Sequence, residues 1–145
     1  MLEIYQGPLP VEEILSRWYQ SQHNRNYGAF ISFVGVVREE NEIEALSFDI
    51  YEPMLRQWYE EWQEKAKAEG AILVMAHSRG DVPVHRSSYI AGVFSPRREV
   101  ALRMIHDFVE DFKAHAPIWK YDVRRGERIY AAERSHRLPG SGLLA

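Results

Sequence analysis

Cysteine is absent from the 145-residue sequence. Its absence excludes disulfide bonds, thiolate metal sites and a cysteine nucleophile. If this protein handles sulfur, the sulfur must therefore arrive on another molecule.

A long apolar run is also missing. No segment approaches the roughly 18 consecutive apolar residues of a membrane-spanning helix. The first residues do not combine a basic segment with an apolar one, as a secretory signal does. We therefore expect a cytoplasmic protein that does not interact with a membrane.

An excess of positive charge is the third missing feature. The chain carries 18 basic and 21 acidic side chains, for a formal net charge of −3. This balance argues against a general polyanion-binding surface, so nucleic acid is not an expected partner. Any site for an anion must be local.

Composition and length indicate one globular domain. Apolar residues make up 46% of the chain and charged residues 27%, which is ordinary for a folded protein. We predict a single domain over residues 1–134. Residues 135–145 contain glycine and proline without periodicity, and we expect them to form a flexible C-terminal tail.

Apolar periodicity predicts three helices and seven strands. The predicted helices span residues 11–20, 53–69 and 97–113, and the predicted strands span residues 2–5, 28–37, 45–51, 71–76, 87–95, 118–123 and 129–130. The order βαββαββαββ indicates an α+β domain with a mostly antiparallel sheet.

Two further expectations concern the strands. Residues 28–37 are almost continuously apolar, so we expect a strand buried on both faces and joined to the next strand as an antiparallel neighbour through a tight loop. Residues 77–84 contain Gly80 and Pro83, and we predict a turn there, inside a hairpin.

Lysine is scarce, with four residues against fourteen arginines, and two of the four flank one corner of the chain. Pro117 cannot continue a helix, so the third helix must end near His115. Lys113 then lies in the last helical turn, and Lys120 lies early in the following strand. A purely structural interpretation remains open, because Lys113 complements the helix dipole and the stem of Lys120 can rest on Trp119.

Three arginines also stand at ends of predicted elements. Arg38 follows the strand of residues 28–37, and Arg97 and Arg98 stand where the third helix begins, a position that favours anions. Guanidinium groups match phosphate oxygens bidentately. The alternative is that Arg38 pairs with Glu39 or Glu40 and that the other two face water.

Three segments together resemble one known family. They are residues 33–38 (FVGVVR), 95–98 (SPRR) and 112–120 (FKAHAPIWK). The chain resembles the large, catalytic subunit of molybdopterin synthase, the MoaE family, in register from about residue 28 to residue 130.

The resemblance implies an α/β hammerhead fold and a sulfurtransferase of molybdenum cofactor biosynthesis. Members of the family use a small ubiquitin-like subunit whose C-terminal Gly-Gly carries a thiocarboxylate. They convert cyclic pyranopterin monophosphate into the dithiolene molybdopterin. The family also implies a homodimer within a heterotetramer, and no cofactor other than the sulfur that the partner supplies.

The resemblance implies residue roles as well. Lys113 would activate the thiocarboxylate, in a pocket for the partner's tail that Trp119 helps to form, and Lys120 would bind substrate and transfer protons. The residues assigned to the phosphate and pterin are Arg38, Arg97, Arg98 and, across a dimer, Arg134. The sequence departs from the family at Arg97, where histidine is frequent, and at Val36, where lysine is common.

Two hypotheses from other classes remain open on the residues alone. The chain could bind a ubiquitin-like tail without catalysis, or it could be an unrelated phosphoester-processing enzyme with a cationic cleft. A metal site is not expected, because no pair of the six histidines shows the i, i+4 spacing with a glutamate that a helical zinc site uses.

Overall fold

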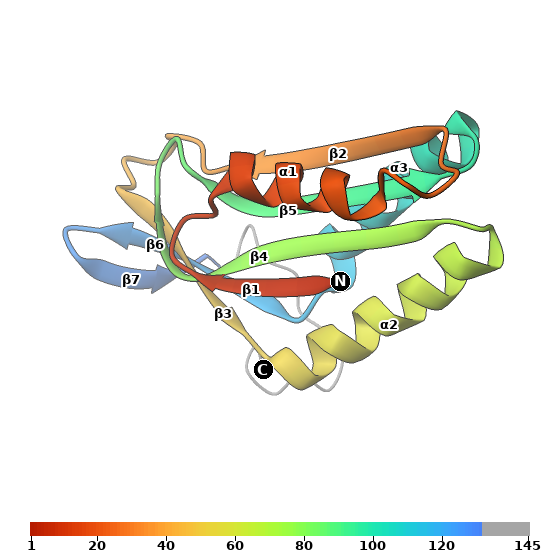
Figure 1. Ribbon diagram of the computed structural model, residues 1–145. Coiled ribbons are helices and arrows are strands. Elements are labelled where there is room, and N and C mark those ends of the chain that lie inside the picture. The colour runs from red at the N-terminus through yellow and green to blue at the C-terminus, as the bar shows by residue number, and fades with distance from the viewer. Residues whose placement is uncertain (132–145) are drawn as a thin grey trace.

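The structure, a computed structural model, describes residues 1–131, and its elements follow the predicted order βαββαββαββ (Figure 1). The helices are α1 (Val11–Gln22), α2 (Glu52–Ala68) and α3 (Arg98–His115). The strands are β1 (Leu2–Gln6), β2 (Ala29–Val36), β3 (Ala45–Ile50), β4 (Ile72–Pro83), β5 (Ser87–Ser95), β6 (Ile118–Arg124) and β7 (Glu127–Tyr130). The predicted α+β class with a mostly antiparallel sheet is confirmed, since β1 and β4 form the one parallel pair among the described strands.

Strand β4 connects the two parts of the sheet. Its first half pairs with β5 and, on the other edge, with β1, whereas residues 80–83 pair with β3. The sheet therefore runs β2-β5-β4-β3-β6-β7. The predicted turn at residues 77–84 was wrong, because Gly80, with φ +83°, bends a continuing strand and Pro83 stands at the strand's last position.

Strand β2 differs from its prediction in two ways. It pairs only with β5, so it lies at an edge of the described sheet, and it does not pair with β3, which lies between β4 and β6. It is not buried on both faces, since Phe33 is 40% and Val36 53% exposed. Its apolar run has another cause: Ile31 packs with α2 and α3, while Phe30 packs with α1 on the opposite face.

Alternating residues of β4 and β5 face two separate layers. Leu73 and Met75 join the core formed with α2 and α3, and Val74 and Ala76 join the core formed with α1. Figure 1 shows α1 and α3 on opposite sides of the β2–β5 pair. Burying both faces of these central strands makes them a rigid support for the elements that lead away from them.

Glu3 fixes β1 to α1. Its carboxylate accepts two hydrogen bonds from Arg17, both 2.7 Å, one from the indole N–H of Trp18 at 2.8 Å and one from the hydroxyl of Tyr5 at 2.8 Å. Burial alone would raise the pKa of Glu3, but these hydrogen bonds outweigh it and lower the pKa from 4.5 to about 2. The charged form of Glu3 is therefore the one that the fold stabilises.

We expect this carboxylate to contribute to the acid sensitivity of the fold. A pKa that is depressed in the folded state adds stability above the unfolded value of about 4.5, and that stability is lost as the pH falls toward about 2. Glu3→Gln should lower the free energy of unfolding at pH 7 and flatten its decline between pH 4.5 and 2, as urea unfolding at several pH values can measure. Glu60→Gln, on the exposed face of α2, is the matched control, and an unchanged decline in Glu3→Gln would contradict this assignment.

Candidate functional site

The corner between α3 and β6 has the predicted geometry. Helix α3 ends at His115, Ala116 is extended with φ −65° and ψ 136°, and β6 begins directly after the buried Pro117. This sharp change of direction places Lys113 on the last turn of the helix and Lys120 on the neighbouring strand. The two lysines line the same pocket.

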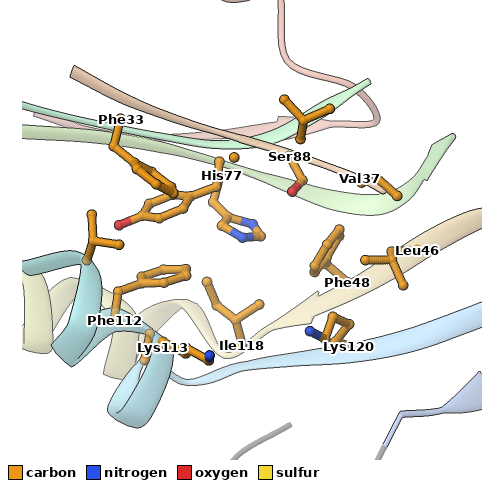
Figure 2. A pocket seen from close by; sticks show the side chains of 15 residues that line it. Phe33, Val37, Leu46, Phe48, His77, Ser88, Phe112, Lys113, Ile118 and Lys120 are labelled. Atoms are coloured by element: carbon orange, nitrogen blue, oxygen red, sulfur yellow. The ribbon is translucent and has the colours of Figure 1, made fainter. Parts of the chain in front are cut away.

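The pocket has a volume of about 310 Å³, at the lower end of the roughly 300–1,000 Å³ of small-ligand sites. Strands β2 to β6 and helix α3 all contribute to its lining. Its walls are mainly apolar, with aromatic side chains from Phe33, Phe48, Tyr89 and Phe112. Figure 2 shows both lysine side chains on the same side of the pocket, with Ile118 between them.

The charge of the pocket is one-sided. Its described lining includes two lysines and no aspartate or glutamate. Positive groups against low-dielectric walls attract an anion more strongly than the same groups on an open surface. The pocket is therefore suited to an anionic group attached to an apolar or aromatic body.

Asp111 holds this end of α3 against α2. Its Oδ2 atom accepts hydrogen bonds from the indole N–H groups of Trp58 at 2.9 Å and Trp62 at 2.6 Å, and its Oδ1 atom lies 2.7 Å from Nδ1 of His115. Burial alone would raise the pKa of Asp111, but these hydrogen bonds lower it below its ordinary value. Asp111 lies two residues before Lys113, so the same contacts position the lysine.

The predicted arginines do not join the lysines within one chain. Arg38 follows β2 next to the lining residue Val37, but its side chain is 81% exposed and pairs with Glu40 at 3.1 Å. Arg98 is the first residue of α3, 15 residues before Lys113, which corresponds to about 22 Å along the helix. Arg97 is also exposed and pairs with Glu99 at 3.2 Å.

Two further predicted positions are not among the described lining residues. Trp119 is 2% exposed and does not line the pocket, because successive residues of β6 point to opposite faces and Lys120 takes the pocket side. Arg134 lies outside the described residues, as does the predicted tail of residues 135–145.

His77 is a pocket residue that the sequence analysis did not find. It lies on β4, is 2% exposed and lines the pocket with its ring surrounded by aromatic side chains. Burial lowers the pKa of His77 to about 4, so the ring is neutral at neutral pH. The apolar run of residues 71–76 was the available signal, because extending that strand past Ala76 would have placed His77 in the core.

Up to Ala131, no group of three histidine, aspartate or glutamate side chains is placed to hold a metal ion. None of the described helices combines the length and the apolarity needed to cross a membrane.

Known proteins resemble this chain along its length. A family model described as MoaE protein matches residues 4–115. A curated relative from Helicobacter pylori strain 26695, named molybdopterin synthase catalytic subunit, is 51% identical over 145 residues and 100% of both chains. A relative from Mycobacterium tuberculosis, named molybdopterin synthase catalytic subunit 1, is 28% identical over 78% of each chain.

Solved structures agree with these relatives. A protein–protein complex of subunits 1 and 2 of molybdopterin-converting factor from Helicobacter pylori 26695 contains a chain with a TM-score of 0.93 and 51% identity, covering 99% of both chains. Molybdopterin synthase from Staphylococcus aureus has a TM-score of 0.75 and 26% identity, covering 88% of this chain and 94% of the other.

Proposed function

The chain belongs to the MoaE family of molybdopterin synthase catalytic subunits, and we propose that in this role it transfers sulfur to cyclic pyranopterin monophosphate. The sulfur comes from the thiocarboxylated C-terminus of a small ubiquitin-like subunit. The observation that carries this proposal is the convergence of Lys113 and Lys120 in one pocket without an acidic lining residue in the described chain.

The chemistry needs fixed cations at this place. The thiocarboxylate of the partner and the cyclic phosphate of the pterin are both anions, and ammonium groups near apolar walls stabilise them and the charge that develops during transfer. In each transfer the sulfur forms a bond to a side-chain carbon of the pterin, which loses an oxygen substituent, and the carbon–sulfur bond of one thiocarboxylate breaks. Water supplies the oxygen that completes the tail's carboxylate. The transfer that we propose uses no cofactor other than the sulfur that the partner supplies, since the chain has no cysteine to carry it.

The roles of the two lysines follow from their elements. Lys113 is exposed at the end of α3, where it can meet a tail that enters from outside, and we assign it to the thiocarboxylate. Lys120 is half-buried on β6, and we assign it to substrate binding and proton transfer. Trp119 is assigned only to supporting this part of β6 from the opposite face.

The arginines are assigned to the phosphate and pterin in an assembly of more than one chain. Arg38 is near enough to the lining to turn toward a bound anion. Arg97 and Arg98 lie at the far end of α3, so they can act on this pocket only from a second copy, in the homodimer within a heterotetramer that the family implies. Arg134 belongs to the same proposal.

We further propose that residues 1–134 form one domain, since all the described strands belong to one sheet, and that the protein acts in the cytoplasm. The partner is a small subunit like the one that accompanies the Helicobacter pylori chain, whose structure is a complex of subunits 1 and 2 of molybdopterin-converting factor.

A reconstitution assay tests the function. We expect the chain, the thiocarboxylated small subunit and cyclic pyranopterin monophosphate together to form the dithiolene product. The amount of product is measured by the fluorescence of its oxidised derivative. A small subunit that ends in an ordinary carboxylate is the control, and it should give no dithiolene product. Binding of the small subunit without product would indicate a non-catalytic module, and turnover of the phosphoester without a thiocarboxylate would indicate a different enzyme.

A further inference from the structure

His77 stands in the pocket wall with aromatic rings on several sides. Its ring centre lies 5.0 Å from that of Phe48, 5.5 Å from that of Phe112 and 5.7 Å from that of Tyr89. Figure 2 shows the ring directed into the pocket between Phe112 and Phe48. The packing leaves the imidazole little freedom to rotate, so its nitrogen atoms have fixed directions.

The hydrogen bond of one ring nitrogen determines the state of the other. Nδ1 lies 2.8 Å from the carbonyl oxygen of Ser78, and a carbonyl oxygen can only accept a hydrogen bond. Nδ1 therefore carries the proton. In the neutral ring Nε2 then has a free electron pair and acts as an acceptor.

Two polar atoms of this wall have no hydrogen-bond partner within residues 1–131. The Nδ1 contact is the one hydrogen bond that His77 makes in this part of the chain, which leaves Nε2 without a donor. The hydroxyl group of Tyr89 is also without a partner there, but this atom is enclosed and does not face the open part of the pocket.

Nε2 of His77 is therefore an acceptor in a mainly apolar wall, and the cations Lys113 and Lys120 are in the same pocket. A ligand that fills the pocket and offers no donor to Nε2 leaves this acceptor unpaired, which weakens binding. An amide N–H of the ligand complements this acceptor.

We propose that Nε2 of His77 accepts a hydrogen bond from an amide N–H of the molecule whose anionic end the two lysines hold. The inference rests on the proposed function for the identity of that molecule. Amide groups occur in the backbone of the partner's C-terminal tail and in the lactam ring of the pterin. His77 is a binding residue, since it is not assigned to bond making or breaking.

Binding measurements on His77→Phe test this inference. The phenyl ring preserves the aromatic packing but has no acceptor, so we expect the dissociation constant of the true ligand to rise about tenfold, and kcat in the assembled enzyme to change by less than about threefold. His77→Gln offers an oxygen at a similar reach and should restore most of the affinity.

Three ligands separate the two sources of the amide. Isothermal titration would use the small subunit in its carboxylate form, the same subunit without its last two glycines, and cyclic pyranopterin monophosphate. If the tail is recognised, the loss in His77→Phe appears with the full-length subunit and disappears with the truncated one. If the pterin is recognised, the loss appears with the pterin alone, and either pattern supports the amide assignment.

Controls keep this result separate from folding and from the proposed function. His106→Phe makes the same change at an exposed position of α3 and should bind like the unmodified chain, and thermal melting identifies any misfolded variant. Unchanged affinity of His77→Phe for both ligands, or a loss that His77→Gln does not restore, would overturn the inference. Normal product formation by the unmodified chain would then leave the proposed function intact. If His77→Phe loses affinity and the unmodified chain forms no product, the inference stands and the proposed function is contradicted.

Discussion

Replacing Lys113 with alanine should lower the rate of product formation by about 100- to 1,000-fold while the complex with the small subunit remains intact. The range is that observed when a preorganised group that stabilises transition-state charge is removed. Lys113 lines the pocket from the last turn of α3, and its side chain is exposed, so truncating it should leave the fold unchanged. Single-turnover formation of the dithiolene product measures the effect, and gel filtration measures the complex.

Lys67→Ala is a suitable control, because this lysine lies in the last turn of another helix, α2, and is also exposed. It should leave product formation unchanged. Lys113→Arg should recover only part of the activity, since a guanidinium keeps the charge but not the shape of an ammonium. Normal turnover by Lys113→Ala would refute the assigned role of this lysine.

Replacing Asp111 with alanine should reduce the free energy of unfolding by about 3 kcal/mol, the largest loss that we expect from a single residue outside the apolar core. The change removes a charged acceptor that binds two indole N–H groups from α2, and such charge-assisted hydrogen bonds contribute about 1.5–3 kcal/mol each when well shielded. Urea unfolding followed by tryptophan fluorescence measures the loss. Product formation should also fall, because the last turn of α3 carries Lys113.

Asp107→Ala is the matched control on the same helix. Asp107 is exposed and contacts the neighbouring His106, so its removal should change the stability by less than about 0.5 kcal/mol. Equal stabilities of the two variants would show that the bonds between Asp111 and the tryptophans of α2 do not hold the two helices together.

The sequence predicted element types well and strand neighbours poorly. The order of the elements was confirmed because apolar period and helix-breaking residues act within a few positions of the chain. The same local signals were misleading at Gly80 and Pro83, which stand inside β4. They were also misleading for β2, since an apolar run does not distinguish a central strand from an edge strand that is covered by helices.

The candidate site was predicted in part. Lys113 and Lys120 were found because Pro117 forces a change of direction between them, a local effect. His77 was missed because a buried histidine leaves no mark of its own in a sequence, and the residues after it resemble a turn. Arg97 and Arg98 were expected beside the lysines, yet the length of α3 separates them within one chain.

The sequence by itself determined where each helix begins and ends to within two residues, that no thiol chemistry of the chain is possible, and that two amines flank one corner. These properties depend on residue type and on neighbours along the chain. Only the tertiary structure decided that six elements close around those amines, that His77 turns an unprotonated nitrogen into the same pocket, and that Trp119 faces the other way. Those outcomes depend on the pairing of segments far apart in the sequence, which is set by burial and hydrogen bonding across the whole fold.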